Sequence, residues 1–357
     1  MTNYNQIRRK TKEIKIGKIA IGGSSPIAVQ SMVNVSGYDL VYSQMKELEN
    51  AGCDIIRMTV PDAEAVRVLA KLKESDLTMP IVADIHFDYR MAIEAAMAGA
   101  DKIRINPGNI GSDDRVKAVV DVCRQKNVPI RVGVNSGSLE KEKLQSFGRA
   151  TAQALAESAL ENVRLLEKFD FDNIVVAVKS SSPYTMAQAN LALAEKCDYP
   201  IHLGVTEAGT YHGGILKSAA GIGGMLLSGV GDTIRISLTD RPVKEVKEGI
   251  ALLKALSFYS KPSLDVVSCP TCGRTKIDII SLAAAFEERA AGISLSQNCK
   301  VAIMGCVVNG PGEAADADFG IAGGIGEAVF FRKGKIMYKI PEDQIIETLL
   351  AELEQYK

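Results

Sequence analysis

The stretch DIIRMTV, residues 54–60, places an arginine among branched apolar residues, and short apolar runs of this kind recur along the chain. Amphipathic stretches typical of helices separate the runs. The eight runs cover residues 27–32, 54–60, 80–86, 101–108, 129–137, 173–181, 200–209 and 232–238. Near-continuous apolar strands that alternate with helices indicate a parallel sheet covered on both faces. Eight such units between residues 27 and 257 predict a TIM (β/α)8 barrel, with a doubly wound open sheet as the alternative.

The pattern changes near residue 258, where SFYSKPSLDVVS (257–268) has the character of a linker. A part that contains cysteines follows, with a helix expected at 278–291. The segment PEDQIIETLLAELEQY (341–356) opens with proline and acidic residues and continues as an amphipathic terminal helix. We therefore predict a barrel domain over 1–257, a linker over 258–268 and a small α+β domain over 269–357.

The composition limits the classes of function. The chain has 357 residues and a formal net charge of −1, which is not the charge of a nucleic-acid-binding protein. Its basic N-terminal segment lacks the apolar core of a signal peptide, and no apolar run is long enough to span a membrane. We expect a cytoplasmic protein, in which a C-x2-C pair binds metal or carries out redox chemistry. No Rossmann fingerprint or P-loop is present, so direct binding of NAD is not expected.

Basic side chains recur within or at the end of the expected strands. They are Arg57, Arg104, Arg131, Lys179 and Arg235. Helices cover the outside of a barrel, so these side chains should point inward, where an unpaired charge is costly. Arginine suits phosphate, and active sites of this fold lie at the carboxyl ends of the strands. The pattern predicts a site for a multiply charged small anion such as a phosphate ester. The alternative is internal pairing with Asp54, Asp84 and Asp232.

Polar side chains follow the same strands. They include Asp84, His86, Asn135, His202 and Glu207. A single histidine is more often a buried structural residue than a catalyst. His86 and Glu207, however, each follow a strand at its productive end, where either could transfer a proton. Cys53, Cys123 and Cys197 lie in apolar or helical contexts, which indicates buried thiols of the core.

The C-terminal part contains SCPTCGRT (268–275) and MGCVVNGPGEA (304–314). Cys269 and Cys272 form a C-x2-C pair, and Cys306 supplies a third thiol. A structural zinc site would need a further cysteine or histidine at finger or ribbon spacing, and none is present. Cys299 lies in an apparent strand and is not expected to be a ligand. An iron–sulfur cluster tolerates widely spaced ligands, and Glu313 is the candidate for the fourth position. A carboxylate ligand would leave one iron open for Lewis-acid chemistry.

Several segments together resemble 4-hydroxy-3-methylbut-2-enyl diphosphate synthase in its bacterial two-domain form. They are CPTCGRT, GCVVNGPGEA, VQSM, ADIHF, IRINPGN and GVTEAG. The resemblance extends over essentially the whole chain. It implies a TIM barrel followed by an α+β domain like the cluster domain of sulfite and nitrite reductases. It also implies a [4Fe-4S] cluster bound by Cys269, Cys272, Cys306 and Glu313.

The same resemblance implies that the barrel binds a cyclic diphosphate. The expected contacts are Arg57, Asp84, His86, Arg104, Arg131, Asn135, Lys179, His202, Arg235 and Ser237, with Glu207 and His86 as catalytic residues. The implied reaction is a two-electron reductive ring opening of 2-C-methyl-D-erythritol 2,4-cyclodiphosphate, supplied with electrons by flavodoxin or ferredoxin. Two alternatives are a zinc-bearing module for RNA or protein binding on an inert barrel, and a siroheme-type reductase.

The geometry of a barrel also bears on the assembly. The last barrel helix, about residues 242–257, would carry the chain about 24 Å away from the carboxyl ends of the strands. The expected linker could span about 37 Å at most, which barely regains that height. We therefore expect a head-to-tail homodimer in which one chain supplies the barrel and its partner the cluster.

Overall fold

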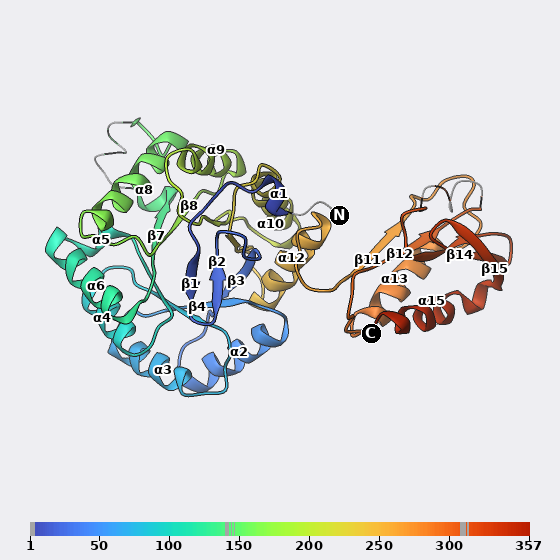
Figure 1. Ribbon diagram of the computed structural model, residues 1–357, viewed down its shortest axis with the longest axis horizontal. Coiled ribbons are helices and arrows are strands. Elements are labelled where there is room, and N and C mark those ends of the chain that lie inside the picture. The colour runs from blue at the N-terminus through green and yellow to red at the C-terminus, as the bar shows by residue number, and fades with distance from the viewer. Residues whose placement is uncertain (1–3, 140–142, 144, 146, 308–311, 313) are drawn as a thin grey trace. The chain divides into compact units, whose positions relative to one another are not determined.

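The computed structural model describes residues 4–139, 143, 145, 147–307, 312 and 314–357 (Figure 1). The chain divides into two compact units, Met1–Phe258 and Tyr259–Lys357. We call them the barrel unit and the C-terminal unit and describe each by itself. Among the described residues, no helix combines the length and the apolar character that a membrane span requires.

Eight parallel strands form the barrel, in the order β8-β7-β6-β5-β4-β3-β10-β9. Their bounds are β3 (Ala28–Met32), β4 (Ile55–Thr59), β5 (Ile81–Asp84), β6 (Lys102–Ile105), β7 (Ile130–Asn135), β8 (Ile174–Lys179), β9 (His202–Leu203) and β10 (Thr233–Ile234). Two parallel bridges, Val176 to Ile201 and Ser180 to Val205, join β8 to β9 and close the ring. All eight strands expected from the sequence are confirmed, and the closed ring excludes an open sheet.

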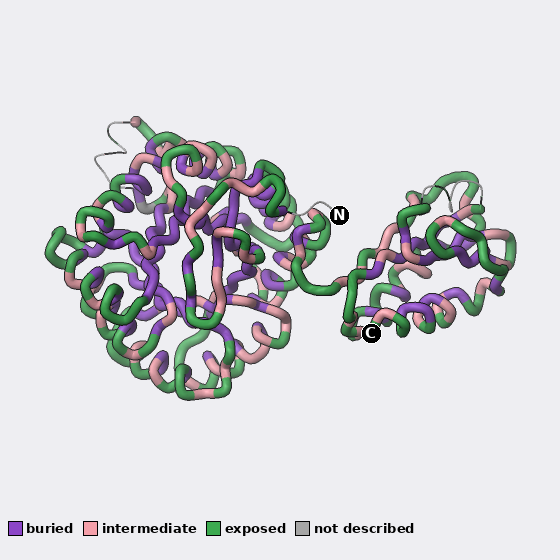
Figure 2. Tube along the Cα trace, in the orientation of Figure 1, coloured by how far each residue is buried: buried purple, intermediate pink, exposed green. Residues whose placement is uncertain are grey.

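Helices surround this ring, and the strands that form it are buried (Figures 1 and 2). The helices are α1 (Tyr4–Ile7), α2 (Tyr38–Asn50), α3 (Ala63–Lys73), α4 (Tyr89–Met97), α5 (Pro107–Ile110), α6 (Asp113–Lys126), α8 (Ala152–Glu167), α9 (Pro183–Ala194), α10 (Tyr211–Ser218), α11 (Gly224–Leu227) and α12 (Pro242–Ala255), with the short turns η1 (Ser136–Ser138) and η2 (Ala219–Gly223). Several begin with a side-chain cap; the Asp62 carboxylate, for example, accepts from the Ala65 N–H at the start of α3.

A small hairpin lies at the amino ends of the barrel strands. Its strands are β1 (Ile14–Ile16) and β2 (Ile19–Ile21). Their isoleucines pack with apolar side chains from the first or second residues of four barrel strands, namely Ala28, Ile55, Val82 and Val175. The sequence analysis did not predict this hairpin, which fills the floor of the barrel. The turn requires Gly17, because a Cβ atom there would lie 2.7 Å from Oδ1 of Asp101.

The C-terminal unit contains a five-stranded sheet in the order β11-β12-β13-β14-β15. Its elements are β11 (Leu264–Ser268), α13 (Ile279–Ala290), β12 (Cys299–Met304), β13 (Phe319–Gly323), β14 (Glu327–Arg332), β15 (Lys335–Pro341), η3 (Glu342–Gln344), α15 (Ile345–Leu353) and η4 (Glu354–Tyr356). The first three strands are parallel and the last two antiparallel to their neighbours. Helices α13 and α15 pack their apolar faces on this sheet. The expected α+β architecture and both expected helices are confirmed.

The expected linker needs a correction. Strand β11 occupies the last five residues of the stretch 258–268 and pairs with β12, from Leu264 opposite Cys299 to Ser268 opposite Ile303. The stretch is polar, contains Pro262 and is only partly buried, so its composition resembles a linker. Pairing with the mostly buried strand β12 nevertheless makes it an edge strand. The segment between the two units is therefore shorter than the sequence indicated.

Candidate active site

A cavity of about 140 Å³ opens at the carboxyl ends of the barrel strands. We call it the basic cavity. Its lining residues are Met32, Arg57, Asp84, His86, Arg104, Arg131, Gly133, Asn135, Ala177, Lys179, Thr206 and Arg235. All five cations that the sequence placed on the inner face are among them. Side chains alternate between the two faces of a strand, so cations on four strands, with Arg235 directly after β10, reach one space.

One carboxylate holds two of these cations. Oδ1 of Asp84 accepts from Nη1 of Arg104 at 2.9 Å, and Oδ2 lies 3.5 Å from Nε of Arg57. Burial alone would raise the pKa of Asp84, but the nearby arginines outweigh it and lower that pKa to about 2. Asp84 is therefore ionised at neutral pH and fixes the orientation of both guanidinium groups.

The other two carboxylates considered for internal pairing lie elsewhere. Asp54 accepts from the backbone N–H of Val29 at the start of the barrel strands. Asp232 forms an ion pair with Arg8 and accepts from the N–H of Ile201. Of the three aspartates, Asp84 alone has an ion pair with cations of the basic cavity among the described contacts.

A second carboxylate was not identified from the sequence. Glu245 lies on the first turn of α12 and is 4% exposed. Its Oε1 accepts from the Leu238 N–H at 2.9 Å, and both oxygens lie 3.3 Å from Nη2 of Arg235. The sequence did contain an indication of this buried carboxylate, because Glu245 lies within the apolar face of the helix that contains Pro242, Val246 and Gly249. Glu245 orients Arg235 as Asp84 orients its two arginines.

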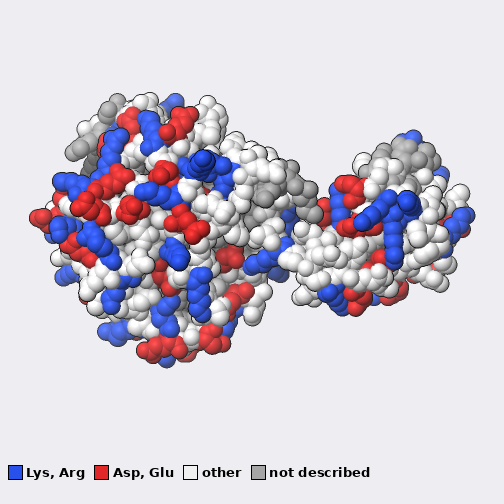
Figure 3. All heavy atoms as spheres, viewed as in Figure 1, with Lys and Arg blue, Asp and Glu red and all other residues white. Residues whose placement is uncertain are grey.

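The basic cavity retains an excess of positive charge, with five cations facing two carboxylates. The Nε atoms of Arg104, Arg131 and Arg235 are buried without a hydrogen-bond partner among the described residues. Burial and the neighbouring guanidinium groups hold the pKa of Lys179 and that of Arg131 well below their usual ranges. By contrast, the face of the barrel unit in Figure 3 mixes both signs of charge. A bound anion would relieve the repulsion inside the cavity, so this arrangement is suited to a polyanionic ligand.

The predicted proton-transfer residues lie at the mouth. The His86 side chain is 46% exposed, and its Nε2 lies 3.9 Å from Oδ2 of Asp84. Glu207 is exposed and follows Thr206, which lines the cavity. Its backbone has a positive φ of 53°, which is uncommon for a residue with a side chain and is often found at functional sites. His86 is thus an exposed lining residue, whereas Glu207 is exposed next to a lining residue and is not itself part of the lining.

Two predicted contacts are not in the lining. His202 is completely buried, and its Nδ1 lies 2.7 Å from Oγ1 of Thr233. In the strand register, His202 on β9 pairs with Thr233 on β10, and Thr233 pairs with Ala28 on β3, which contacts the hairpin at the barrel floor. It therefore lies below the lining residues of the cavity, and its contact with the substrate stays a prediction. Ser237 is half-buried and also lies outside the set of lining residues.

The structure adds three interior residues to the sequence interpretation. Sδ of Met32 accepts from Nη2 and Nε of Arg57 at 2.6 and 3.2 Å. A Cβ atom at Gly133 would lie 2.7 Å from Nε of Arg104, so only glycine leaves room for that arginine. Lys102 is fully buried two residues before Arg104, and burial lowers its pKa well below the usual range. Strand alternation could have revealed all three.

The predicted thiols lie on two neighbouring loops of the C-terminal unit. Cys269 and Cys272 follow β11, and Cys306 follows β12. Because β11 and β12 are parallel, their carboxyl ends lie at one edge of the sheet. The Gly305 N–H donates to Sγ of Cys269 at 3.2 Å, which ties the loops together. A Cβ atom at Gly305 would lie 2.9 Å from Cγ2 of Thr275, so glycine is needed for this approach.

The thiols differ in chemistry. Hydrogen bonds from the Arg274 backbone and the Thr275 side chain lower the pKa of Cys272, which favours the thiolate that binds metals. Burial raises the pKa of Cys299 to about 12. All seven cysteines are free thiols. No three histidine, cysteine or acidic side chains converge at metal-binding distance among the described residues. Glu313, the predicted fourth ligand, lies outside them.

Known structures share the barrel. Yersinia pestis dihydropteroate synthase aligns with 69% of this chain and 98% of its own, with a TM-score of 0.50 and 13% identity. A truncated 3-deoxy-D-arabino-heptulosonate 7-phosphate synthase from Thermotoga maritima aligns with 71% of this chain and 98% of its own, with a TM-score of 0.50 and 14% identity. At such low identity these similarities support the fold alone.

Sequence comparisons are more specific. The model of the GcpE TIM-barrel domain matches residues 11–250, and that of the GcpE protein C-terminal domain matches residues 265–355. Proteins named 4-hydroxy-3-methylbut-2-en-1-yl diphosphate synthase (flavodoxin) from Ruminiclostridium cellulolyticum and Caldanaerobacter subterraneus subsp. tengcongensis are 51% and 53% identical to this chain, over 98% of each chain in both pairs. Neither the zinc module nor the siroheme reductase is supported. The chain therefore belongs to the GcpE family, as its sequence motifs indicated.

Proposed function

We propose that this chain reduces 2-C-methyl-D-erythritol 2,4-cyclodiphosphate to (E)-4-hydroxy-3-methylbut-2-enyl diphosphate. The names of its curated relatives support the reaction. The observation that carries the proposal is the convergence of five cations in one cavity of a chain that also places three thiols on adjacent loops. The cyclic dianion takes up two electrons and one proton and yields a trianion and one water molecule. The cation-rich cavity favours the additional charge of the product.

In this proposal the basic cavity binds the diphosphate. Guanidinium groups of Arg57, Arg104 and Arg131 and the Lys179 ammonium group contact its oxygens, and buried guanidinium atoms without partners provide the donors. Asn135 lies among them and positions the ring. Asp84 and Glu245 act through the arginines that they hold, so they are positioning residues.

The proton enters from the mouth of the cavity. His86 lines the cavity, Glu207 directly follows the lining residue Thr206, and both side chains are exposed, so both can exchange protons with solvent. We assign proton transfer to these two residues. His202 and Ser237, like Glu207, are not among the lining residues, and their contact with the substrate stays a prediction.

The three loop thiols fit an iron–sulfur cluster. Thiolates are the ligands that such clusters require, and the lowered pKa of Cys272 favours this form. We propose that Cys269, Cys272 and Cys306 hold a [4Fe-4S] cluster, with Glu313 as its fourth ligand. The cluster would supply electrons singly, and flavodoxin, which the names of the relatives include, would be their source. A reducing cytoplasm would keep these thiols available.

A head-to-tail homodimer would complete the site. The Phe258 ring packs 4.8 Å from the Tyr4 ring, measured between centroids. The Tyr4 hydroxyl donates to the carbonyl of Gly231, two residues before β10. The chain thus leaves the barrel unit near the amino ends of the strands, at the end opposite the basic cavity. A second chain in the opposite orientation would bring its thiol loops to this cavity.

The reaction is tested with protein that is prepared without oxygen and carries its cluster. With the cyclic diphosphate and reduced flavodoxin, the phosphorus NMR signals of the ring should give way to those of a linear diphosphate. A protein that has its cluster and binds the substrate, yet leaves the ring intact with both flavodoxin and a chemical reductant, would disprove the proposed reaction.

The dimer is tested by mixing two inactive variants. Arg131→Ala chains retain the thiols, and Cys306→Ser chains retain the basic cavity. If the site is shared, subunit exchange gives mixed dimers with one complete site, and activity appears. A mixture that stays inactive after exchange has been confirmed by mass spectrometry contradicts the shared site.

A further inference from the structure

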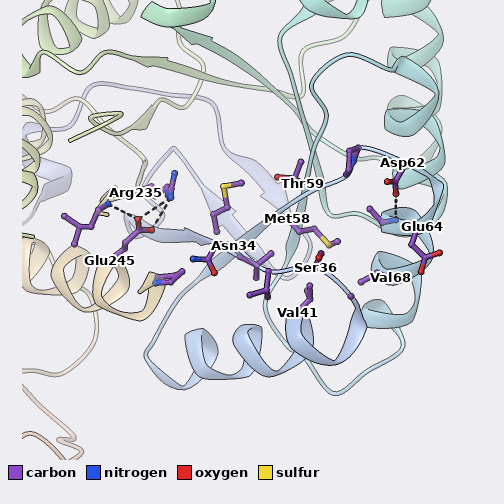
Figure 4. Close-up of a pocket in the computed structure, with 18 of the residues that line it drawn as sticks. Asn34, Ser36, Val41, Met58, Thr59, Asp62, Glu64, Val68, Arg235 and Glu245 are labelled. Carbon is purple, nitrogen blue, oxygen red and sulfur yellow. Dashed lines mark hydrogen bonds and ion pairs between the residues drawn. The ribbon is translucent and has the colours of Figure 1, made fainter. Parts of the chain in front are cut away.

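A second cavity, of about 580 Å³, opens beside the basic cavity (Figure 4). We call it the side pocket. It is formed by the loops that follow β3, β4 and β10, and its volume is typical of small-molecule sites. Met32 and Arg235 line both cavities, so these two side chains stand between adjacent spaces. A ligand whose anionic group occupies the basic cavity would extend into the side pocket past these side chains.

The side pocket has an apolar wall. Val41, Met58 and Val68 are buried side chains that line it. Figure 4 shows Arg235 and Glu245 at one end, Val41 and Met58 in the middle, and Val68 near the acidic side chains at the other end. The pocket thus offers a hydrocarbon-like wall beyond the cation. Burying an apolar chain against this wall is favourable, because the chain leaves water.

The acidic residues of the lining already have partners. Asp62 caps α3, and Glu64 forms an ion pair with Arg67. Asp240 lies 2.7 Å from Nζ of Lys244. The fourth acid is Glu245, whose oxygens contact Arg235. Each of the four carboxylates therefore already has a hydrogen-bond or ion-pair partner within the protein.

We propose that the side pocket binds the hydrocarbon chain of a linear alkenyl diphosphate longer than the five-carbon product, with its diphosphate group in the basic cavity. The proposal rests on the proposed function, which assigns the basic cavity to a diphosphate. Reactions that join five-carbon alkenyl diphosphates end to end yield such molecules. They have the same head group and a longer tail. A ligand of this class would compete with the cyclic substrate.

Chain length provides the test. Pyrophosphate, isopentenyl diphosphate and geranyl diphosphate are titrated calorimetrically into full-length protein that carries its cluster. Each methylene group that is buried raises affinity by roughly fourfold. We expect geranyl diphosphate to bind at least tenfold more tightly than isopentenyl diphosphate after the cost of ordering its chain, and to raise the KM of the substrate without lowering kcat.

A variant and its control test whether the hydrocarbon chain of the ligand occupies the side pocket. Ala65 lines the side pocket one helical turn before Val68, so Ala65→Phe fills the pocket with an aromatic ring. The variant should lose most of the tenfold gain and keep its affinity for pyrophosphate. Ala63 lies on the same helix, is exposed and does not line the pocket, so Ala63→Phe should retain the gain.

The outcomes separate the two proposals. Equal affinity for all three anions, or a gain that persists in Ala65→Phe, overturns the side-pocket proposal and leaves the proposed reaction standing. If neither pyrophosphate nor the cyclic diphosphate binds at all, the basic cavity is not a diphosphate site, and the proposed function is contradicted as well.

Discussion

Replacement of Asp84 by asparagine is the most informative single change in the barrel unit. The carboxylate is 2% exposed and holds Arg57 and Arg104. Its pKa falls from the ordinary 3.8 to about 2, which corresponds to about 2 kcal/mol of stability at neutral pH. Breaking a buried pair typically costs about 3–5 kcal/mol, because the partner charges lose their counterion. We therefore expect Asp84→Asn to lower the free energy of unfolding by about 3 kcal/mol.

The pH dependence follows from the same shift. The folded pKa of Asp84 is depressed, so its contribution is complete above the unfolded pKa near 3.8 and is lost as the pH falls toward 2. The stability difference between the wild-type protein and Asp84→Asn should be constant between about pH 5 and 8. It should narrow only in acid, below about pH 4, where the wild-type carboxylate becomes protonated.

Pyrophosphate tests whether the Asp84 carboxylate compensates positive charge in the basic cavity. Removing Asp84 leaves one more uncompensated positive charge in the basic cavity, so an anion should stabilise the variant more than the wild-type protein. A ligand at a hundred times its Kd adds about 2.7 kcal/mol. Urea denaturation without oxygen, with and without pyrophosphate, measures both increments. Asp54→Asn is the control, since Asp54 lies outside the cavity. Equal increments in Asp84→Asn and the wild-type protein would refute the reasoning.

Three further predictions concern the cavity and the thiols. Gly133→Ala places a Cβ atom 2.7 Å from Nε of Arg104 and should weaken pyrophosphate binding about tenfold. Gly137→Ala is the control, because a Cβ atom there has no other atom within 4 Å and should leave the affinity for pyrophosphate unchanged. Anion binding should raise the depressed pKa of Lys179, so the affinity for pyrophosphate should fall as the pH rises. Calorimetry in buffers of different ionisation enthalpy should detect proton uptake on binding. Unchanged proton uptake in Lys179→Met would show that the proton does not go to Lys179. Cys299→Ser should keep the absorption of the cluster near 400 nm, whereas Glu313→Ala should make the cluster labile; the reverse result would exchange their roles.

The sequence was sufficient for the parts of the fold that depend on a repeating pattern. Eight apolar runs of strand length identified the barrel, and the helices that cover its outside implied that Arg131 and Lys179 point inward. The C-x2-C pair with Cys306 predicted three ligands of one metal or cluster. The barrel features are local, because each apolar run depends on residues a few positions apart.

The remaining features depend on contacts between distant residues. The three-residue strands of the floor hairpin are too short to show a period, and pairing with β12 alone makes residues 264–268 a strand. His202 faces inward as expected, but its depth depends on register with Thr233 and Ala28, which one sequence does not determine. The role of Glu245 follows from the position of α12 beside β3 and β10, and the side pocket arises from three loops.

The floor hairpin has a consequence for proton exchange inside the barrel. Because Ile16 and Ile21 are fully buried against the floor, protons that Lys102 and His202 exchange with solvent leave most readily through the carboxyl end. A ligand seated in the basic cavity covers that route, so exchange becomes slow while it is bound. Once the ligand is seated, the protonation of Lys102 and His202 should follow a change in external pH more slowly than it does in the free barrel.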